Sequence, residues 1–194
     1  MLSQLIDNSR TDKNTAHSYI DLYETLLSSK KYTATNVLEI GIGDGGQGVT
    51  NGGSIKLWHD YFQGATIHAL DIQPITEIWP ELLENDRIKL YTSIDAYNYN
   101  TFKQLFLDIN LKCDLILDDG PHTLDSMKTC IELYTQILKD NGILIIEDIQ
   151  DILWIDILKS VVPENLQQYV KVFDLRHIKG RNDDIVFVID KSNL

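Results

Sequence analysis

Apolar and polar positions follow two alternating periods along the chain. Short, mainly apolar runs end in glycines or acids, a pattern typical of strands buried on both faces of a sheet. We predict strands in these runs, at 36–43, 66–72, 87–92, 114–119 and 143–148. Between them, apolar residues recur every three or four positions, which is the spacing of amphipathic helices. We predict helices there, at 17–28, 54–62, 99–109, 124–138 and 151–160, with Ser54 as a cap and Asn141-Gly142 as the stop after 138.

The last part of the chain departs from this alternation. Residues 169–175 and 184–189 have the composition of two further strands, and only the turn-rich segment 179–183 lies between them. Strands joined without a helix are expected to pair antiparallel. The whole pattern predicts an α/β fold with a mostly parallel seven-stranded sheet, an antiparallel last strand and helices on both faces. Ligands of such sheets bind beyond the carboxyl ends of the strands.

Length, charge and cysteine content indicate which classes of protein the chain can belong to. A chain of 194 residues, 43% of them hydrophobic, predicts one domain over 1–194, with a helical segment at 1–33 and the α/β core at 34–194. The net charge of −12 disfavours binding to nucleic acid or to anionic membranes. Cys113 and Cys130 are too few for a disulfide scaffold or a cysteine zinc site. No apolar stretch approaches the roughly 20 residues of a membrane span, and the start lacks the apolar run of a signal peptide, so we expect a cytoplasmic location.

The first predicted strand runs into a glycine-rich loop. Gly41, Gly43 and Gly46 match G-x-G-x-x-G, a pattern that is weak by itself, but seven glycines lie between Gly41 and Gly53. Glycines let a backbone approach a ligand closely, although a turn without a ligand is the alternative. Asp71 ends the next strand, where its carboxylate would accept both hydroxyls of a ribose, unless it only faces water.

Acids also end the later strands. Asp118 and Asp119 precede Gly-Pro and His122, and Glu147 and Asp148 follow the fifth strand. Carboxylates of this kind suit Mg²⁺, Mn²⁺ or Ca²⁺, and neighbouring parallel strands would bring Asp119 and Asp148 close enough to share one ion. His122 is placed to act as a general base near neutral pH. The alternatives are a packing residue at a helix start for His122 and a helix cap for Asp148.

Together these motifs resemble those of class I S-adenosylmethionine-dependent methyltransferases. The segments Glu39-Ile-Gly-Ile-Gly, Gly-Gly-Ser-Ile-Lys-Leu-Trp and Ala-Leu-Asp71-Ile look like their first two motifs. The closer resemblance is to the metal-dependent macrolide sugar O-methyltransferases of the mycinamicin and macrocin type, followed by the cephalosporin-hydroxylase-like group. The segments 11–19 and 181–188 also look like that family, so the resemblance covers nearly the whole chain.

The resemblance implies a Rossmann-like methyltransferase fold and a role for each motif. It places cofactor contacts at Glu39, Gly41, Gly43, Ser54, Asp71, Ile72, Ser93, Ile94, Asp95 and Asp118. It implies a divalent cation, Mg²⁺ or Mn²⁺, held by Asp119, Glu147 and Asp148. His122 would be the catalytic base, with Asp119 beside it in the catalytic site. Pro121 departs from the small polar residue usual there, and the sequence has no counterpart of the macrolide enzymes' additional amino-terminal domain, so the resemblance does not imply a macrolide acceptor.

The leading hypothesis is therefore an enzyme that transfers a methyl group from S-adenosylmethionine to a sugar hydroxyl. The acceptor would be a nucleotide sugar, a glycan or a glycosylated natural product, and the apolar stretch 152–158 would suit a homo-oligomer contact. One alternative is a nicotinamide-dependent oxidoreductase or epimerase, a class whose short-chain members use a Tyr-x-x-x-Lys pair. The other is a cofactor-binding protein without catalytic activity.

Overall fold

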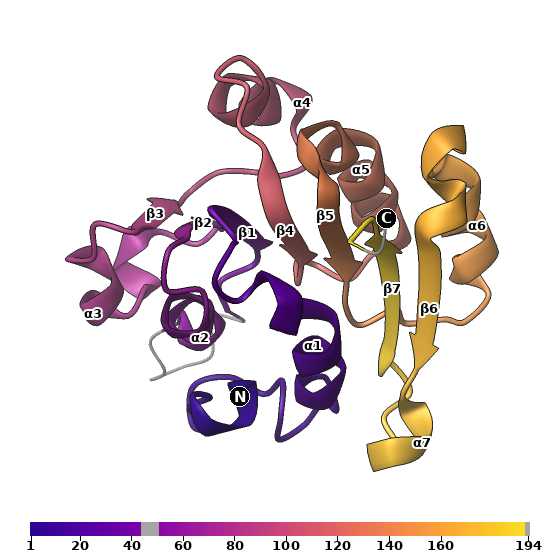
Figure 1. Cartoon of the computed structure of the whole chain (residues 1–194), viewed down its shortest axis with the longest axis horizontal. Coiled ribbons are helices and arrows are strands. Elements are labelled where there is room, and N and C mark those ends of the chain that lie inside the picture. The colour runs from indigo at the N-terminus through magenta and orange to yellow at the C-terminus, as the bar shows by residue number, and fades with distance from the viewer. Residues whose placement is uncertain (44–50, 193–194) are drawn as a thin grey trace. The chain divides into compact units, whose positions relative to one another are not determined.

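The structure is a computed structural model that describes residues 1–43 and 51–192 (Figure 1). The chain forms two compact units, the first spanning Met1–Ile94 and the second beginning at Asp95. Each unit carries part of the predicted strand and helix pattern, and each is described by itself.

The first unit contains three parallel strands. They are β1 (Asn36–Ile40), β2 (Thr66–Leu70) and β3 (Ile88–Tyr91), in the order β3-β2-β1 (Figure 1). Glu39 pairs with Ala69, and Leu70 pairs with Tyr91, so the three carboxyl ends lie at one edge. The strands expected from the apolar runs are confirmed, and the glycine turn and Asp71 follow directly at that edge.

The helices of the first unit are α1 (Ile20–Leu27), α2 (Gly53–Tyr61) and α3 (Pro80–Leu83), and 3₁₀ turns lie at Leu2–Gln4, Ser28–Lys30 and Ile75–Glu77. The predicted cap at Ser54 is wrong. Helix α2 begins at Gly53, its N-cap is Gly52 with φ of 123°, and Ser54 is buried inside the first turn. A β-carbon on Gly53 would stand 2.2 Å from the carbonyl oxygen of Arg10, so only glycine fits at this position.

The second unit contains four strands. They are β4 (Cys113–Asp118), β5 (Leu138–Ile146), β6 (Val170–Asp174) and β7 (Ile185–Asp190), in the order β4-β5-β7-β6. Strands β4 and β5 are parallel, and β7 is antiparallel to both β5 and β6. The predicted antiparallel ending of the sheet is confirmed. This pairing brings the connection between β6 and β7 to the same edge as the ends of β4 and β5.

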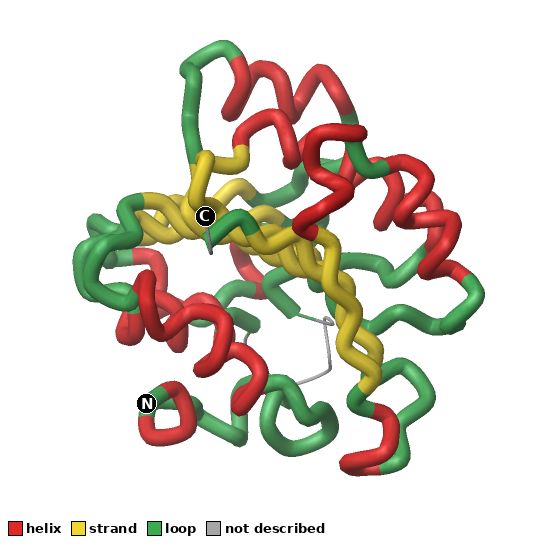
Figure 2. Tube along the Cα trace, turned by 45° about the vertical axis from the view of Figure 1, so that its right-hand side comes forward, coloured by secondary structure: helices red, strands yellow, loops and turns green. Residues whose placement is uncertain are grey.

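Along the second unit, helices alternate with strands in chain order. Figure 2 draws the helices in red and the strands in yellow. The helices are α4 (Tyr99–Phe102), which continues as a π-helical turn at Lys103–Leu107, then α5 (Leu124–Tyr134), α6 (Trp154–Val161) and α7 (Arg176–Lys179), with 3₁₀ turns at Thr135–Ile137 and Glu164–Tyr169. On and beside α6, Ile155 and Leu158 are buried, whereas Leu153 is 74% exposed. Among all described helices, none has the length and apolar character that a membrane crossing requires.

The predicted helix at 124–138 is too long. Helix α5 ends at Tyr134, and β5 already begins at Leu138, so Asn141-Gly142 lies within the strand and does not stop the helix. The pairing jumps here, since Leu138 lies opposite Cys113 whereas Ile143 lies opposite Leu115. Asn141-Gly142 therefore marks an irregularity in β5. In the sequence, such a turn-forming pair looks the same whether it ends a helix or interrupts a strand.

The buried imidazole of His68 on β2 should make stability depend on acid. Burial, aided by the charge of Lys89, lowers the pKa of His68 from 6.5 to about 4. The unfolded chain therefore binds a proton that the folded chain rejects, so the free energy of unfolding should fall as the pH drops from 6.5 towards 4, by up to about 3 kcal/mol. Urea titrations of wild type and His68→Gln would measure this, and the variant should lose less stability over that range. Equal losses in the two proteins would contradict the prediction.

Candidate functional site

The glycine turn after β1 is tightly built. Gly41 has φ of 88°, a left-handed conformation that favours glycine, and its N–H donates to the carbonyl oxygen of Leu70. A β-carbon on Gly43 would stand 2.4 Å from the Asn51 side chain. Gly46 and the rest of the loop at 44–50 lie outside the described residues. The described part of the turn is therefore closely packed, and the predicted approach of its backbone to a ligand stays a prediction.

Asp71 is the centre of a small network in the first unit. Its carboxylate is 7% exposed and accepts hydrogen bonds from the N–H groups of Ile42, at 2.6 Å, and Gln73, at 2.7 Å. The Ser93 N–H donates to the Gln73 carbonyl oxygen, and the Ile94 N–H donates to that of Asp71. Four predicted cofactor residues, Gly41, Asp71, Ser93 and Ile94, are therefore held close together. The side chain of the neighbouring Ile72 is 72% exposed.

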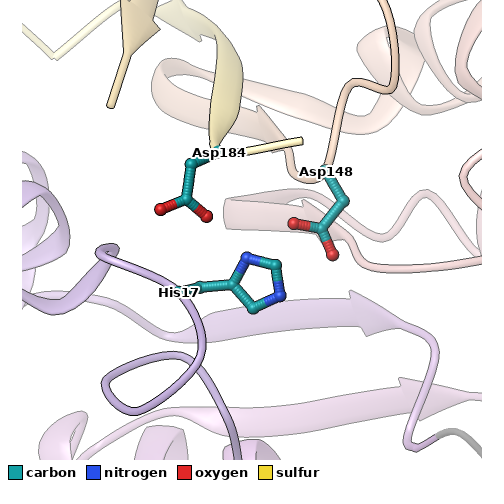
Figure 3. Close-up of side chains that lie close together, drawn as sticks. All are labelled: His17, Asp148 and Asp184. Carbon is teal, nitrogen blue, oxygen red and sulfur yellow. The ribbon is translucent and has the colours of Figure 1, made fainter. Parts of the chain in front are cut away.

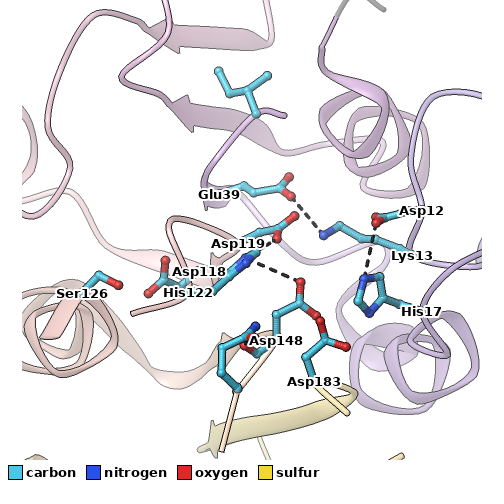
Figure 4. Close-up of polar contacts among 12 residues, drawn as sticks. Asp12, Lys13, His17, Glu39, Asp118, Asp119, His122, Ser126, Asp148 and Asp183 are labelled. Atoms are coloured by element: carbon cyan, nitrogen blue, oxygen red, sulfur yellow. Dashed lines mark hydrogen bonds and ion pairs between the residues drawn. The ribbon is translucent and has the colours of Figure 1, made fainter. Parts of the chain in front are cut away.

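Glu39 is fully buried at the end of β1. The indole N–H of Trp58 donates to its Oε2 at 2.7 Å, and the ammonium of Lys13 lies 3.7 Å from its Oε1 (Figure 4). Ser54, which the resemblance assigns to the cofactor, is buried in α2. Lys13 was not among the expected site residues, although it lies within the family-like segment 11–19.

In the second unit, Asp118 ends β4 as a buried carboxylate. The Tyr97 hydroxyl donates to its Oδ1 at 2.5 Å, and its Oδ2 has no hydrogen-bond partner among the described residues. Burial raises the pKa of Asp118 to about 6, and the hydrogen bond from Tyr97 opposes this rise only in part. Asp95 accepts a hydrogen bond from the Tyr97 N–H at 2.9 Å, and a β-carbon on Gly120 would stand 2.0 Å from the Tyr97 hydroxyl. Asp95 and Asp118 are therefore linked through Tyr97.

Asp119, His122 and Asp148 meet beyond β4 and β5 (Figure 4). The His122 Nε2 lies 3.1 Å from an oxygen of Asp119 and 3.5 Å from one of Asp148. Burial alone would lower the pKa of His122, but the hydrogen bond and charge of Asp119 and the charge of Asp148 outweigh it and raise that pKa above 6.5. The predicted meeting of Asp119 and Asp148 is confirmed.

Three of the predicted site residues have a left-handed backbone conformation. His122 has φ of 53°, Asp148 has φ of 54° and Ser93 has φ of 57°. Residues other than glycine rarely adopt this left-handed backbone conformation, because it is strained. Such strain persists only where the surrounding contacts impose it, and it is frequent at functional sites. Asn110 is the one further case among the described residues, in the turn before β4. No local signal in the sequence identifies these strained positions.

A second acid faces Asp148. Asp184, immediately before β7, is fully buried, and one of its carboxylate oxygens lies within 4.8 Å of one of Asp148 (Figure 3). Asp184 lies within the segment 181–188 that resembles the sugar O-methyltransferases, but the sequence alone assigned no role to it. Glu147 is also buried, and its N–H donates to the Asp118 carbonyl oxygen, but it is not part of the group formed by Asp119, His122 and Asp148.

This donor set fits a divalent cation. In the group of Asp119, His122 and Asp148, one ligand atom from each residue lies within 4.8 Å of the others. Carboxylate oxygens are the ligands that Mg²⁺ and Mn²⁺ prefer. Buried carboxylates as close as Asp148 and Asp184 repel each other unless a proton or a cation lies near them. Asp119 and Asp148 are therefore the residues that would hold such an ion.

One Tyr-x-x-x-Lys spacing is present in the chain, at Tyr99–Lys103, and it bears on the oxidoreductase alternative. Tyr99 lies on α4 and is 51% exposed, and the ammonium of Lys103 pairs with Asp108 in the adjoining turn. The two residues therefore lie on an exposed helical face with a local ion pair, so the spacing gives the alternative no structural support.

The similar curated proteins are sugar O-methyltransferases. The chain is 24% identical over 144 residues to 8-demethyl-8-alpha-L-rhamnosyl tetracenomycin-C 2'-O-methyltransferase of Streptomyces olivaceus, covering 74% of this chain and 36% of that protein. It is 25% identical to demethylmacrocin O-methyltransferase of Streptomyces fradiae, covering 79% of this chain and 37% of that protein. The chain thus spans about a third of the length of these relatives. No protein-family model matches it.

Similar solved structures cover almost the whole chain. The methyltransferase MycE of the mycinamycin biosynthetic pathway, in complex with Mg, SAH and mycinamycin VI, is 20% identical with a TM-score of 0.76, covering 97% of this chain and 53% of that one. The N-methyltransferase NodS of Bradyrhizobium japonicum, in complex with S-adenosylhomocysteine (SAH), has a TM-score of 0.55 and 14% identity, covering 96% of this chain and 93% of that one. The chain therefore has the fold of the class I S-adenosylmethionine-dependent methyltransferases, as its motifs predicted.

Proposed function

We propose that this chain catalyses the transfer of a methyl group from S-adenosylmethionine to a sugar hydroxyl, assisted by a divalent cation. The observation that carries the proposal is the group of Asp119, His122 and Asp148 beyond the ends of β4 and β5. The sugar O-methyltransferases among its relatives support the same chemistry. The acceptor would be a nucleotide sugar, a glycan or a glycosylated natural product.

The cofactor would supply an electrophilic methyl group on its sulfonium. Glu39, Gly41, Gly43, Ser54 and Asp71, with Ile72, Ser93 and Ile94, would bind it, and the resemblance adds Asp95 and Asp118 as predicted contacts. The fit rests on Asp71, since each carboxylate oxygen accepts one backbone N–H and retains lone pairs for a ribose hydroxyl. The exposed side chain of Ile72 suits contact with an adenine ring.

Asp119 and Asp148, with Glu147 as the third predicted ligand, would hold the cation, which when bound lowers the pKa of a coordinated acceptor hydroxyl. His122 lies between the same two carboxylates, which favour its protonated form. With an ion bound, Asp119 and Asp148 would favour the imidazolium less, and a neutral His122 would be able to take the acceptor proton. Asp119 thus orients His122 as well as binding the ion.

Further expectations about the protein belong to the same proposal. The net charge of −12 disfavours nucleic acid and anionic membranes as partners, and we expect the enzyme to work in the cytoplasm on a small molecule. The exposed apolar side chains Ile152, Leu153 and Ile157 would suit a contact between two copies. A single catalytic domain over 1–194 remains our prediction.

Calorimetry and mass spectrometry test the proposed function. Titration with SAH should show binding, whereas NAD⁺ should not bind, with or without Mg²⁺. Incubation with S-adenosylmethionine, Mg²⁺ and a panel of nucleotide sugars and glycosides should then yield an acceptor heavier by one methyl group. Binding of NAD⁺ in preference to SAH would overturn the proposal in favour of the oxidoreductase alternative.

Asp71→Ala should weaken SAH binding by about 1–3 kcal/mol, because hydrogen bonds from ribose hydroxyls to a buried carboxylate are lost. Isothermal titration calorimetry measures the change. Glu81→Ala removes an exposed acid from α3 of the same unit and should leave the affinity unchanged. If Asp71→Ala binds SAH as tightly as wild type, Asp71 does not contact the ribose.

A further inference from the structure

The connection between β6 and β7 is basic in an otherwise acidic chain. Arg176, Lys179 and Arg181 fall within residues 176–181, which contain no acid, whereas the whole chain has a net charge of −12. Helix α7 lies in this connection (Figure 1). The connection forms an open pocket of about 460 Å³, and Arg176, Arg181 and Asn182 are among the residues that line it. Such a lining favours an anionic ligand.

Both arginines of this pocket are oriented by an aspartate and remain accessible. The Arg176 guanidinium donates through Nε and Nη2 to Asp174, at 2.8 and 2.6 Å. The Arg181 guanidinium donates through the same two nitrogens to Asp183, at 3.0 and 2.8 Å. Within the described ranges 1–43 and 51–192, neither Nη1 group donates to a protein acceptor, and the two side chains are 39% and 41% exposed. A ligand in solution can therefore reach a fixed guanidinium edge on each arginine.

The pocket adjoins the acids that would hold the cation. The Leu175 N–H donates to the Asp184 carbonyl oxygen at 2.8 Å, and the Asp184 carboxylate faces that of Asp148. Arg181 precedes Asp184 by three positions, so their Cα atoms lie at most about 11 Å apart. The pKa of Arg181 is raised mainly by its hydrogen bonds to Asp183, and the charges of Asp148 and Asp184 add to the rise. A sugar whose hydroxyl lies near Asp148 can therefore carry an anionic group to the pocket.

We propose that this pocket binds the diphosphate of a nucleotide-sugar acceptor, with Arg176 and Arg181 donating to its phosphate oxygens. The inference rests on the proposed function, and it selects one of the acceptor classes named there. Two guanidinium edges match two phosphates, and the planar fork of arginine suits phosphate oxygens. In an acidic chain, a local positive potential also helps an anionic acceptor to approach the carboxylates around Asp148. The competing interpretation is that the two ion pairs only fix the turn between β6 and β7.

Inorganic pyrophosphate and phosphate test the pocket without any assumption about the sugar or the base. Calorimetric titrations in excess EDTA exclude binding through a cation. Wild type should bind pyrophosphate more tightly than phosphate. Arg176→Gln and Arg181→Gln should each weaken pyrophosphate binding by about tenfold, the scale of a hydrogen bond to a charged group, and should leave SAH affinity unchanged. Lys159→Gln is the matched control, since it removes an exposed cation that pairs with Asp156 on α6, and it should leave both affinities unchanged.

A panel of acceptors distinguishes a diphosphate from other sources of phosphate. Nucleotide sugars, the corresponding sugar 1-phosphates and methyl glycosides are each offered with S-adenosylmethionine and Mg²⁺, and methylated products are detected by mass spectrometry. Nucleotide sugars should be methylated with the highest kcat/KM. Arg181→Gln should raise their KM by about tenfold with kcat nearly unchanged, because the pocket binds a part of the acceptor away from the reacting hydroxyl.

Contrary outcomes separate this inference from the proposed function. Pyrophosphate that does not bind wild type, or that binds wild type and both arginine variants equally, overturns the inference alone, and if one variant does not fold, the other decides. Preferred methylation of methyl glycosides or of sugar 1-phosphates also overturns it, while the methyl transfer itself upholds the proposed function. Failure of wild type to bind SAH overturns the proposed function, and the acceptor assignment with it.

Discussion

Asp148→Ala is expected to lower kcat by about 10²–10³-fold while leaving SAH affinity nearly unchanged, because losing the cation forfeits several kcal/mol of transition-state stabilisation. Asp148 lies 3.5 Å from His122 and faces the buried Asp184, so it is central to the group that would hold the ion. Asp119→Ala should have a similar effect. Excess EDTA should reproduce it in the wild type, and added Mg²⁺ or Mn²⁺ should restore the rate to the wild type alone.

The measurements are steady-state kinetics, with calorimetry for SAH and electron paramagnetic resonance for bound Mn²⁺. Asp156→Ala is the matched control, since it removes a side chain that is 95% exposed on α6 of the same unit. Full activity in excess EDTA would refute the metal requirement and leave a metal-free methyltransferase. Loss of SAH affinity in Asp148→Ala would show that the acid supports the cofactor site and not an acceptor-bound ion.

His122→Ala should lower kcat by about 10²–10⁴-fold, the usual contribution of general acid–base catalysis, with little change in the affinity for SAH or Mg²⁺. The wild-type rate should rise with pH through one ionisation, and the variant should lose that rise. In the metal-free protein Asp119 and Asp148 hold the pKa of His122 above 6.5. Since a cation neutralises those carboxylates, Mg²⁺ should lower this pKa, and imidazole proton resonances in NMR would follow the change.

His177→Ala is the matched control for His122→Ala, since it removes an exposed histidine from α7 of the same unit and should preserve the rate. Near-normal kcat in a folded His122→Ala variant would assign His122 to packing before α5, and the base would then be solvent. A His122 pKa that does not respond to Mg²⁺ would contradict competition between cation and proton for Asp119 and Asp148.

The sequence alone located most of the strands and the residues that follow them. A strand that is buried on both faces consists almost entirely of apolar residues, so it is recognisable in the sequence as a short apolar run. Asp71 and Asp119 follow such runs directly and Asp148 follows one residue later, so the local pattern already determined their position at a strand end. The resemblance to sugar O-methyltransferases rested on the same residues, and the comparisons support it.

Local pattern failed where a distant partner decides the conformation. The end of α5 at Tyr134 depends on where Leu138 pairs with Cys113, which lies 25 residues earlier. At the start of α2, Gly52 is the N-cap instead of Ser54, and Arg10 from the amino-terminal segment packs closely against Gly53. In both cases the periodicity of apolar residues fits the predicted helix boundary as well as the observed one, and tertiary contacts determine which of them forms.

The sequence by itself determined which chemical groups stand at the ends of the strands. A buried strand needs apolar side chains along its length, so the first polar side chains after an apolar run mark its end. The tertiary structure decided which of those groups meet. It brings Asp184 to Asp148 through the antiparallel pairing of β5 and β7, and it places Lys13 beside Glu39 through the fold of the amino-terminal segment. It also holds His122 and Asp148 in left-handed conformations that no local preference predicts. These features depend on strand register and on packing between segments far apart in the chain, and periodicity along the sequence carries no information about either.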